Sequence, residues 1–190
     1  MKKRVNEIFY SLQGEGRNTG RAAVFVRFAG CNLRCQFCDT DFTDYREMTD
    51  EEIVDAVSRF PSTFVVLTGG EPTLQVDEAF VELLHVHGYE VAMETNGTQV
   101  PPANIDWLTV SPKGSIAVRR CNELKVVWTN EHVPLEELSR TVTADYYYLQ
   151  PCDTGHELTN RIIIEQCIDY IKEHPQWRLS LQTHKLIGIR

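Results

Sequence analysis

Three cysteines lie close together in the stretch GCNLRCQFCDT at positions 30–40. Thiolates are soft ligands suited to zinc or to an iron–sulfur cluster, and spacings of three and then two residues let one short loop wrap a metal centre. A tetrahedral zinc ion and a four-iron cluster each have four places to fill. Cys31, Cys35 and Cys38 therefore predict a metal centre whose fourth ligand comes from elsewhere.

The source of that fourth ligand separates two interpretations. A structural zinc site needs one more protein ligand, such as Cys152, Cys121 or a histidine, and the chain offers no second close pair of cysteines. The other interpretation leaves one iron free of protein. Buried thiols without a metal are the weakest interpretation, because the residues between the cysteines are mostly polar.

Polar residues of the kinds that do chemistry also follow short apolar runs. The candidate strands are 22–28, 63–68, 90–95, 107–111, 123–127, 146–150 and 178–182. The polar residues after them are the cysteines, Thr68 to Glu71, Glu94 to Asn96, Ser111 to Lys113, Gln150 to Asp153, and Gln182 with His184. Near-continuous β-rich apolar runs are typical of buried parallel strands. The carboxyl ends of such strands share the face on which barrel enzymes place their chemistry.

Helical patterns alternate with these strands over 49–60, 77–87 and 159–173. The first opens with Thr49 and Glu52 in the spacing of a capping box. Strand–helix alternation implies a parallel sheet with right-handed crossovers. The connections that contain Pro101 and Pro112 are too short or too irregular for a proper helix. We therefore predict an α/β fold, a trimmed and partial (β/α) barrel with short or missing helices in its middle crossovers.

Composition limits the kind of protein. The 190 residues include 42% hydrophobic and 24% charged residues, which is ordinary for one soluble domain, and no apolar run approaches a membrane span. The first residues lack the apolar core of a signal peptide, so we expect a cytoplasmic protein with reduced thiols. A net charge of −8 argues against non-specific binding to nucleic acid. The substrate is therefore expected to be a small molecule.

The cysteine loop, written C-x3-C-x2-C, resembles the cluster signature of the radical S-adenosylmethionine (SAM) enzymes, in which SAM chelates the open iron. The sequence TGGEP at 68–72 resembles their glycine-rich turn, whose backbone approaches the methionyl amino group because glycine has no side chain in the way. The resemblance implies one 4Fe-4S cluster on the three cysteines, within a single radical SAM domain over residues 1–190. The cofactor would then do the hard chemistry.

Five stretches resemble one family of these enzymes, the 7-carboxy-7-deazaguanine synthases. They are SLQGEG (11–16), CDT (38–40), SPK (111–113), QPCD (150–153) and the final QTHKLIGIR. The resemblance covers essentially the whole chain. It implies a carbon–nitrogen lyase that converts 6-carboxy-5,6,7,8-tetrahydropterin to 7-carboxy-7-deazaguanine with loss of ammonia, on the route to queuosine. It also implies a homodimer and a flavodoxin-like reductant.

The resemblance assigns substrate contacts to Leu12, Gln13, Gly14, Glu15, Arg27, Thr68, His184 and Arg190. Arg27 lies inside a strand, where its guanidinium fork needs a carboxylate partner, either that of the substrate or a structural acid such as Glu15. For Arg190 the terminal carboxylate would reach the substrate, although the family often ends in proline there. Thr40 matches a Mg²⁺ ligand, with water and the substrate carboxylate completing the octahedron; its alternative is to cap a turn.

SAM contacts are expected at Phe37, Cys38, Asp39, Gly70, Glu94, Asn96, Ser111, Pro112, Lys113, Gln150, Pro151, Cys152 and Asp153. Glu94 and Asn96 are included because they face the predicted mouth, although ETNGT equally describes a plain turn. We assign no role to Cys121 and expect Cys167 to pack on the apolar side of a helix.

Two other functions fit part of the pattern. An activase for a glycyl-radical enzyme shares the three-cysteine loop, but it has no reason to pair residues 13–15 with Thr40 and Arg27 for a small carboxylated ring. A non-catalytic zinc or iron–sulfur module is the alternative from a different class, and it would not cleave SAM.

Overall fold

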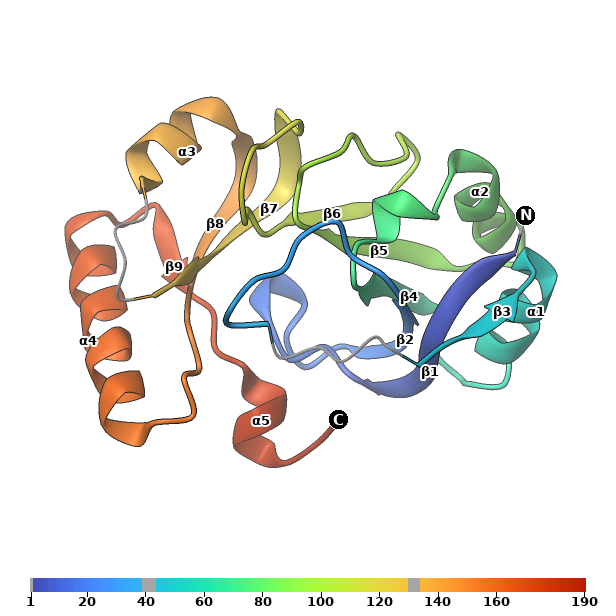
Figure 1. The fold of residues 1–190 in the computed structure, drawn as a ribbon, viewed down its shortest axis with the longest axis horizontal. Coiled ribbons are helices and arrows are strands. Elements are labelled where there is room, and N and C mark those ends of the chain that lie inside the picture. The colour runs from blue at the N-terminus through green and yellow to red at the C-terminus, as the bar shows by residue number, and fades with distance from the viewer. Residues whose placement is uncertain (1, 39–43, 130–133) are drawn as a thin grey trace.

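The computed structural model describes residues 2–38, 44–129 and 134–190, which form one nine-stranded sheet with helices packed on it (Figure 1). The strands are β1 (Lys3–Leu12), β2 (Ala22–Phe28), β3 (Arg46–Met48), β4 (Phe64–Gly69), β5 (Glu90–Thr95), β6 (Trp107–Val110), β7 (Arg120–Trp128), β8 (Thr143–Pro151) and β9 (Trp177–Leu179). The helices are α1 (Asp50–Val57), α2 (Glu78–Val86), α3 (Leu135–Thr141), α4 (Glu157–Glu173) and α5 (Thr183–Ile187). None of these helices is long and apolar enough to cross a membrane.

The strand order is β3-β1-β2-β4-β5-β6-β7-β8-β9. All neighbours from β2 to β9 are parallel, whereas β1 pairs antiparallel with both β2 and β3. Within the described residues no pairing joins β3 to β9, so the barrel stays open. The prediction of a partial parallel barrel is confirmed.

All seven predicted strands are present as β2 and β4 to β9, whereas β1 and β3 were not predicted. β1 pairs irregularly with β2 between Val5 and Glu7, and this irregularity breaks the alternation that marks a strand. The last strand was predicted over 178–182, but β9 ends at Leu179, and the chain then leads to α5.

The helical crossovers also follow the prediction closely. The Thr49 hydroxyl accepts from the Glu52 N–H at 3.2 Å and the Thr49 N–H donates to the Glu52 carboxylate at 2.7 Å, which is the predicted capping box. Residues 96–106 and 111–119, all described, contain no helix. The short helices α3 and α5 were missed, and α5 buries none of its residues.

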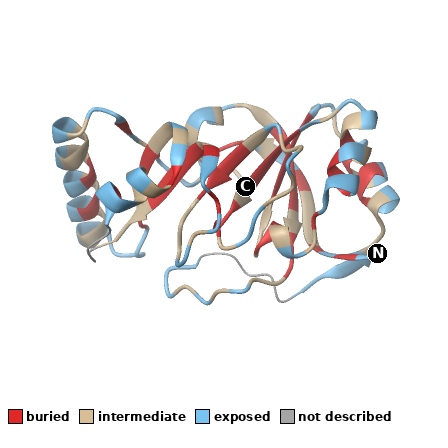
Figure 2. Cartoon of the chain, turned by 90° about the horizontal axis from the view of Figure 1, so that it is seen from above, coloured by how far each residue is buried: buried red, intermediate tan, exposed pale blue. Residues whose placement is uncertain are grey.

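The core has two parts, which lie on opposite faces of the sheet. One joins the sheet to its helices and includes Leu67, Leu124 and Ile53, while a smaller cluster with Phe25 and Val66 lies on the other face. Figure 2 shows the buried residues concentrated along the strands and on the helix sides that face them. Cys121 and Cys167 belong to the first part, where burial raises the pKa of each thiol to about 12. Packing therefore accounts for both.

Candidate active site

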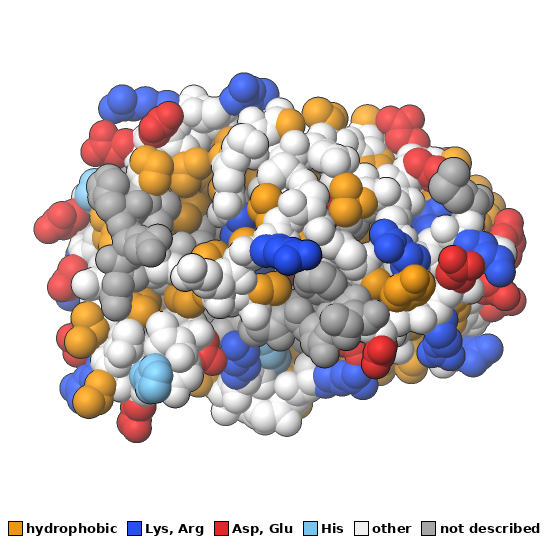
Figure 3. All heavy atoms as spheres, viewed as in Figure 1, with side chains coloured by type: hydrophobic (Ala, Val, Ile, Leu, Met, Phe, Trp, Pro, Cys, Tyr) orange, Lys and Arg blue, Asp and Glu red, His pale blue; other side chains and the backbone are white. Residues whose placement is uncertain are grey.

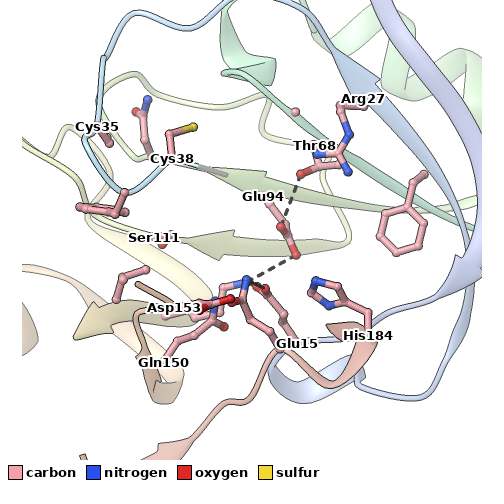
Figure 4. A pocket seen from close by; sticks show the side chains of 18 of the residues that line it. Glu15, Arg27, Cys35, Cys38, Thr68, Glu94, Ser111, Gln150, Asp153 and His184 are labelled. Atoms are coloured by element: carbon pink, nitrogen blue, oxygen red, sulfur yellow. Dashed lines mark hydrogen bonds and ion pairs between the residues drawn. The ribbon is translucent and has the colours of Figure 1, made fainter. Parts of the chain in front are cut away.

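A cavity of about 550 Å³ lies at the carboxyl ends of the parallel strands. Figure 4 shows Cys35 and Cys38 on one side of it and Glu15 and His184 on another. Among the predicted site residues it is lined by Leu12, Gln13, Gly14, Glu15, Arg27, Cys31, Cys35, Phe37, Cys38, Thr68, Gly70, Glu94, Asn96, Ser111, Lys113, Gln150, Pro151, Cys152, Asp153, His184 and Arg190. The fold thus brings distant motifs into one place.

Three predicted residues are not among those lining the cavity. Asp39 and Thr40 lie outside the described residues, so the predicted Mg²⁺ ligand has no structural description. Pro112 lies in the chain between Ser111 and Lys113, which do line the cavity.

The cysteine loop presents its thiols to the cavity beside hydrogen-bond donors. The sulfur of Cys31 accepts from the Leu33 N–H at 3.4 Å and lies 4.0 Å from the amide nitrogen of Asn96. Burial raises the pKa of Cys35, and the nearby ammonium of Lys113 opposes that rise. N–H donors directed at sulfur are a feature of thiolates that ligate iron–sulfur clusters, so the surroundings of Cys31 fit that role.

The spacing of these thiols also bears on the kind of metal centre. Among the described residues, no three His, Cys, Asp or Glu side chains converge as they would around one metal ion. A four-iron cluster binds each thiolate at a different iron and does not need such convergence. The absence of such a group among the described residues is therefore compatible with a four-iron cluster on the three cysteines.

The glycine-rich turn after β4 packs directly on the start of the cysteine loop. The Gly70 N–H donates to the Phe28 carbonyl at 2.8 Å, and the Glu71 N–H donates to the Gly30 carbonyl at 2.9 Å. A Cβ atom at Gly70 would lie only 1.9 Å from the Gly30 oxygen. Glycine is therefore required at position 70 by this backbone contact, a reason that the sequence alone did not reveal.

Glu71 ties the turn to the end of β5. Its fully buried carboxylate accepts from the Thr95 hydroxyl at 2.7 Å and from the Asn96 N–H at 2.8 Å, and it also accepts from Thr73. The Asn96 amide in turn donates to Asn32 at 2.9 Å. Glu71 thus fixes Asn96 against the cysteine loop. No role was predicted for Glu71 itself.

A second group of polar residues forms another wall of the cavity. The Gln13 amide donates to Glu94 at 3.0 Å. The Thr68 hydroxyl donates to the other Glu94 oxygen at 3.4 Å (Figure 4). Glu94 therefore lies among residues predicted to contact the substrate, although it was itself predicted to contact SAM.

Lys125, which was not among the predicted site residues, lies behind this wall. Its ammonium pairs with Glu15 at 2.5 Å and lies 3.6 Å from Glu94, with a side chain only 4% exposed. Burial alone would raise the pKa of Glu15, but Lys125 and a 3.1 Å hydrogen bond from Gln182 lower it to about 2. One signal was available: Glu123 and Lys125 are charged at alternate positions of an apolar strand, so they share one face.

Arg27 has a protein partner, but it is not Glu15. Its Nε donates to Glu7 at 2.8 Å, and the guanidinium of Arg190 pairs with the other oxygen of the same carboxylate. Glu7 belongs to β1, the strand that was not predicted. The Ser11 hydroxyl donates to an oxygen of the terminal carboxyl group of Arg190 at 2.6 Å and holds this residue at the cavity.

The final helix closes over the segment that contains Gly14. The Thr183 N–H donates to the Gly14 carbonyl at 2.9 Å, and a Cβ atom at Gly14 would lie 2.2 Å from the His184 ring. Lys185 pairs with Asp153 at 3.2 Å. The Gly155 N–H, Asn160 and Lys185 together lower the pKa of Asp153 to about 2. Residues near the two ends of the sequence thus meet at one cavity.

An open parallel barrel with a three-cysteine loop against a glycine-rich turn is the architecture of radical SAM proteins. The model of the Radical SAM superfamily matches residues 25–114. A 7-carboxy-7-deazaguanine synthase from Bacteroides thetaiotaomicron is 47% identical over 192 residues, and one from Bradyrhizobium diazoefficiens is 44% identical over 214 residues; each alignment covers 100% of both chains. The crystal structure of QueE from Escherichia coli aligns with a TM-score of 0.77 and 30% identity, over 97% of this chain and 95% of that one. The chain belongs to the 7-carboxy-7-deazaguanine synthase family.

Proposed function

We propose that this chain converts 6-carboxy-5,6,7,8-tetrahydropterin to 7-carboxy-7-deazaguanine with loss of ammonia, as a radical SAM enzyme on the route to queuosine. The observation that carries the proposal is that one cavity has thiols at one side and a cluster of carboxylates and amides at another. A small polar ring held by that cluster would face the cysteine loop. The family of the chain supports the same reaction.

Family membership implies a 4Fe-4S cluster and SAM, and the residues present fit both. Cys31, Cys35 and Cys38 would hold three irons of the cluster. When bound, the cluster and SAM supply a carbon-centred radical that removes a hydrogen atom from the substrate. The turn at Gly70 and the strand-end residues Ser111, Lys113 and Gln150 to Asp153 would hold SAM.

Lys113 suits the SAM carboxylate. Its ammonium lies 4.9 Å from the centre of the Phe37 ring, and burial lowers the pKa of this lysine. A carboxylate ligand would offset the cost of burying the charge, and Phe37 would cover the adenosine beside it.

The substrate ring would lie against Gln13, Glu15 and Glu94. Carboxylate and amide oxygens are acceptors, which suits the amino and N–H groups along the pyrimidine edge of a pterin. Thr68 and His184, which line the same cavity, would complete the contacts.

The carboxylate of the substrate would approach Arg27, beside which the Arg190 guanidinium also lies, while the terminal carboxylate of Arg190 would itself reach the substrate, as the family resemblance implies. Both guanidiniums already hold Glu7, so the substrate carboxylate would join or replace that partner. We also propose that Mg²⁺ bound at Thr40 shares this carboxylate, with water completing its coordination. The guanidinium groups and the Mg²⁺ ion would together hold the substrate carboxylate and thereby fix the adjacent C6 carbon. A hydrogen-atom transfer requires such a fixed geometry.

The deciding experiment is an anaerobic assay of the reconstituted chain with SAM, dithionite and the pterin, with and without Mg²⁺. We expect 7-carboxy-7-deazaguanine by mass spectrometry, and less of it without Mg²⁺. Activity only on a glycyl-radical protein partner would favour an activase instead. A preparation with neither iron nor 5′-deoxyadenosine would favour a zinc module.

We further propose a single radical SAM domain over residues 1–190, since one sheet carries every described strand. We also propose that the protein is cytoplasmic and is reduced by a flavodoxin-like protein, because the cluster needs reduced thiols and a low-potential electron. The family resemblance supports the further proposal of a homodimer. Basic and acidic side chains are interspersed on the face of the molecule that Figure 3 shows, which suits specific rather than non-specific contacts. Light scattering would report the oligomeric state.

A further inference from the structure

Lys125 occupies an unusual place for a lysine. It lies within β7, between the buried apolar residues Leu124 and Val126, and its own side chain is 4% exposed while it still lines the cavity. Burying an ammonium is costly unless carboxylates compensate it. The reason for keeping a lysine here therefore lies in the groups that it faces.

Those groups are mainly carboxylates, and they come from three elements. Glu15 follows β1 and pairs with Lys125 at 2.5 Å; Glu94 on β5 lies 3.6 Å away; Glu123 shares the β7 face and accepts from the Arg17 N–H at 2.9 Å. Among the residues that the structure describes, Lys113 and His184 are the other charged or titratable groups that act on this network. Lys125 is thus the ammonium common to Glu15 and Glu94.

The side chains of Glu15 and Glu94 are 15% and 26% exposed, so both are partly buried. Carboxylates that share an ammonium in such a site stay ionised, whereas without it their mutual repulsion favours protonation of one of them. Burial opposes the charge of Lys125, yet its carboxylate neighbours outweigh burial and raise its pKa above the ordinary value. The ammonium is therefore permanently charged at neutral pH. An ionised carboxylate offers only acceptors, whereas a protonated one also carries a donor.

We propose that Lys125 is a positioning residue that keeps Glu15 and Glu94 both ionised and thereby selects a ring with an amino group over one with a carbonyl at the same edge. The inference rests on the proposed function, because it assumes that the pterin ring lies on these two carboxylates. A 2-amino-4-oxo ring presents N–H donors to both oxygens. A 2,4-dioxo ring places a carbonyl acceptor against a carboxylate and is rejected.

The test measures binding of 6-carboxypterin and of 6-carboxylumazine, its 2-oxo counterpart, to the reconstituted protein with SAM by anaerobic calorimetry. We expect the wild type to prefer the pterin by about tenfold or more, the value of one hydrogen bond to a charged group. Lys125→Met should lose that preference. Lys172→Met, which removes an exposed lysine from α4, should keep it.

Infrared spectroscopy supplies a readout that a general loss of structure would not produce. At pH 7 the Lys125→Met protein should show a protonated carboxyl band that is absent from the wild type and is removed again by Glu15→Gln or Glu94→Gln. Unchanged preference in Lys125→Met, or no new band, overturns the inference. A wild type that binds neither ring would instead count against the proposed function.

If Lys125→Met does not fold, the wild type still decides the matter. Its infrared spectrum at pH 7 should contain no protonated carboxyl band that Glu15→Gln or Glu94→Gln removes. The presence of such a band shows that the two carboxylates are not both ionised, and it overturns the inference.

Discussion

At the scale of single residues, the cavity depends on charged groups that the fold has buried and compensated. Glu71 is the clearest case, because its carboxylate has no exposed surface and serves Thr73, Thr95 and Asn96 together. A buried acceptor with several donors is costly to alter, since each donor loses its partner.

Replacing Glu71 with glutamine tests this role. The amide NH₂ would face backbone and hydroxyl donors, so we expect Glu71→Gln to lower the free energy of unfolding by about 1–3 kcal/mol. Urea denaturation measures the change. The control Glu165→Gln alters a carboxylate that is 63% exposed on α4 and should shift stability by less than about 0.5 kcal/mol. Equal stability of the wild type and Glu71→Gln would contradict the account.

Glu15 predicts a specific response to acid. Its folded-state pKa of about 2 lies below the ordinary value of 4.5, so the stability that it contributes is present above pH 4.5 and is lost as the pH falls toward 2. The stability advantage of the wild type over Glu15→Gln, about 1–3 kcal/mol at pH 6, should therefore shrink toward pH 3. Denaturant titrations at both pH values measure it. An advantage that does not change with pH would refute this prediction.

The residues found from sequence were those in compact motifs after strands, where several unusual side chains stand together. Lys125 and Glu7 were not found because each lies within a strand and not in a motif after one, and a charged side chain there usually points to solvent. Only the three-dimensional fold, in which the strands curve into an open barrel, shows that Lys125 and Glu7 face the cavity. Their partners come from positions 20 to 183 residues away in the chain, a separation that no local pattern encodes.

At the scale of elements, the site depends on how closely the glycine-rich turn approaches the cysteine loop. Gly70 touches the backbone of Gly30, and a backbone atom cannot move aside as a flexible side chain can. The strands and helices that deliver these loops were largely predictable, because their periodicity and caps are local properties. The contact between the glycine-rich turn and the cysteine loop could not be predicted, because it joins segments that are distant in the sequence.

Gly70→Ala should separate the turn from the loop. The added methyl group would overlap the Gly30 carbonyl at 1.9 Å, so we expect reconstituted protein to retain well under half of its iron. Iron analysis and visible absorbance measure this. The control Gly114→Ala places a methyl group in open space and should retain full iron. Full iron in Gly70→Ala would show that the contact is dispensable.

At the scale of the whole molecule, residues 183–190 hold a position over the cavity without contributing to the core. No residue of α5 is buried, yet this segment contacts Gly14, Asp153, Glu7 and Ser11. Weak burial combined with contacts to the site suggests a role in binding rather than in folding.

Deletion of residues 183–190 separates these roles. We expect the free energy of unfolding to change by about 1 kcal/mol or less, because little apolar surface is lost. Affinity for 6-carboxypterin should fall by about tenfold or more, because His184 and Arg190 are removed. Calorimetry and urea denaturation measure the two quantities separately. A large loss of stability with intact affinity would contradict this division.

The hydrogen bond that joins Gly14 to the last helix has a consequence for biosynthesis. A polypeptide leaves the ribosome from its amino end at about 5–20 residues per second, so the cysteine loop emerges well before Asn96, Lys113 and α5 exist. In the nascent chain the three thiols are therefore not yet enclosed by the residues that surround them in the folded protein. Loading of iron should therefore follow translation, and prematurely terminated fragments should carry the cysteines but not the enclosure that protects a bound centre.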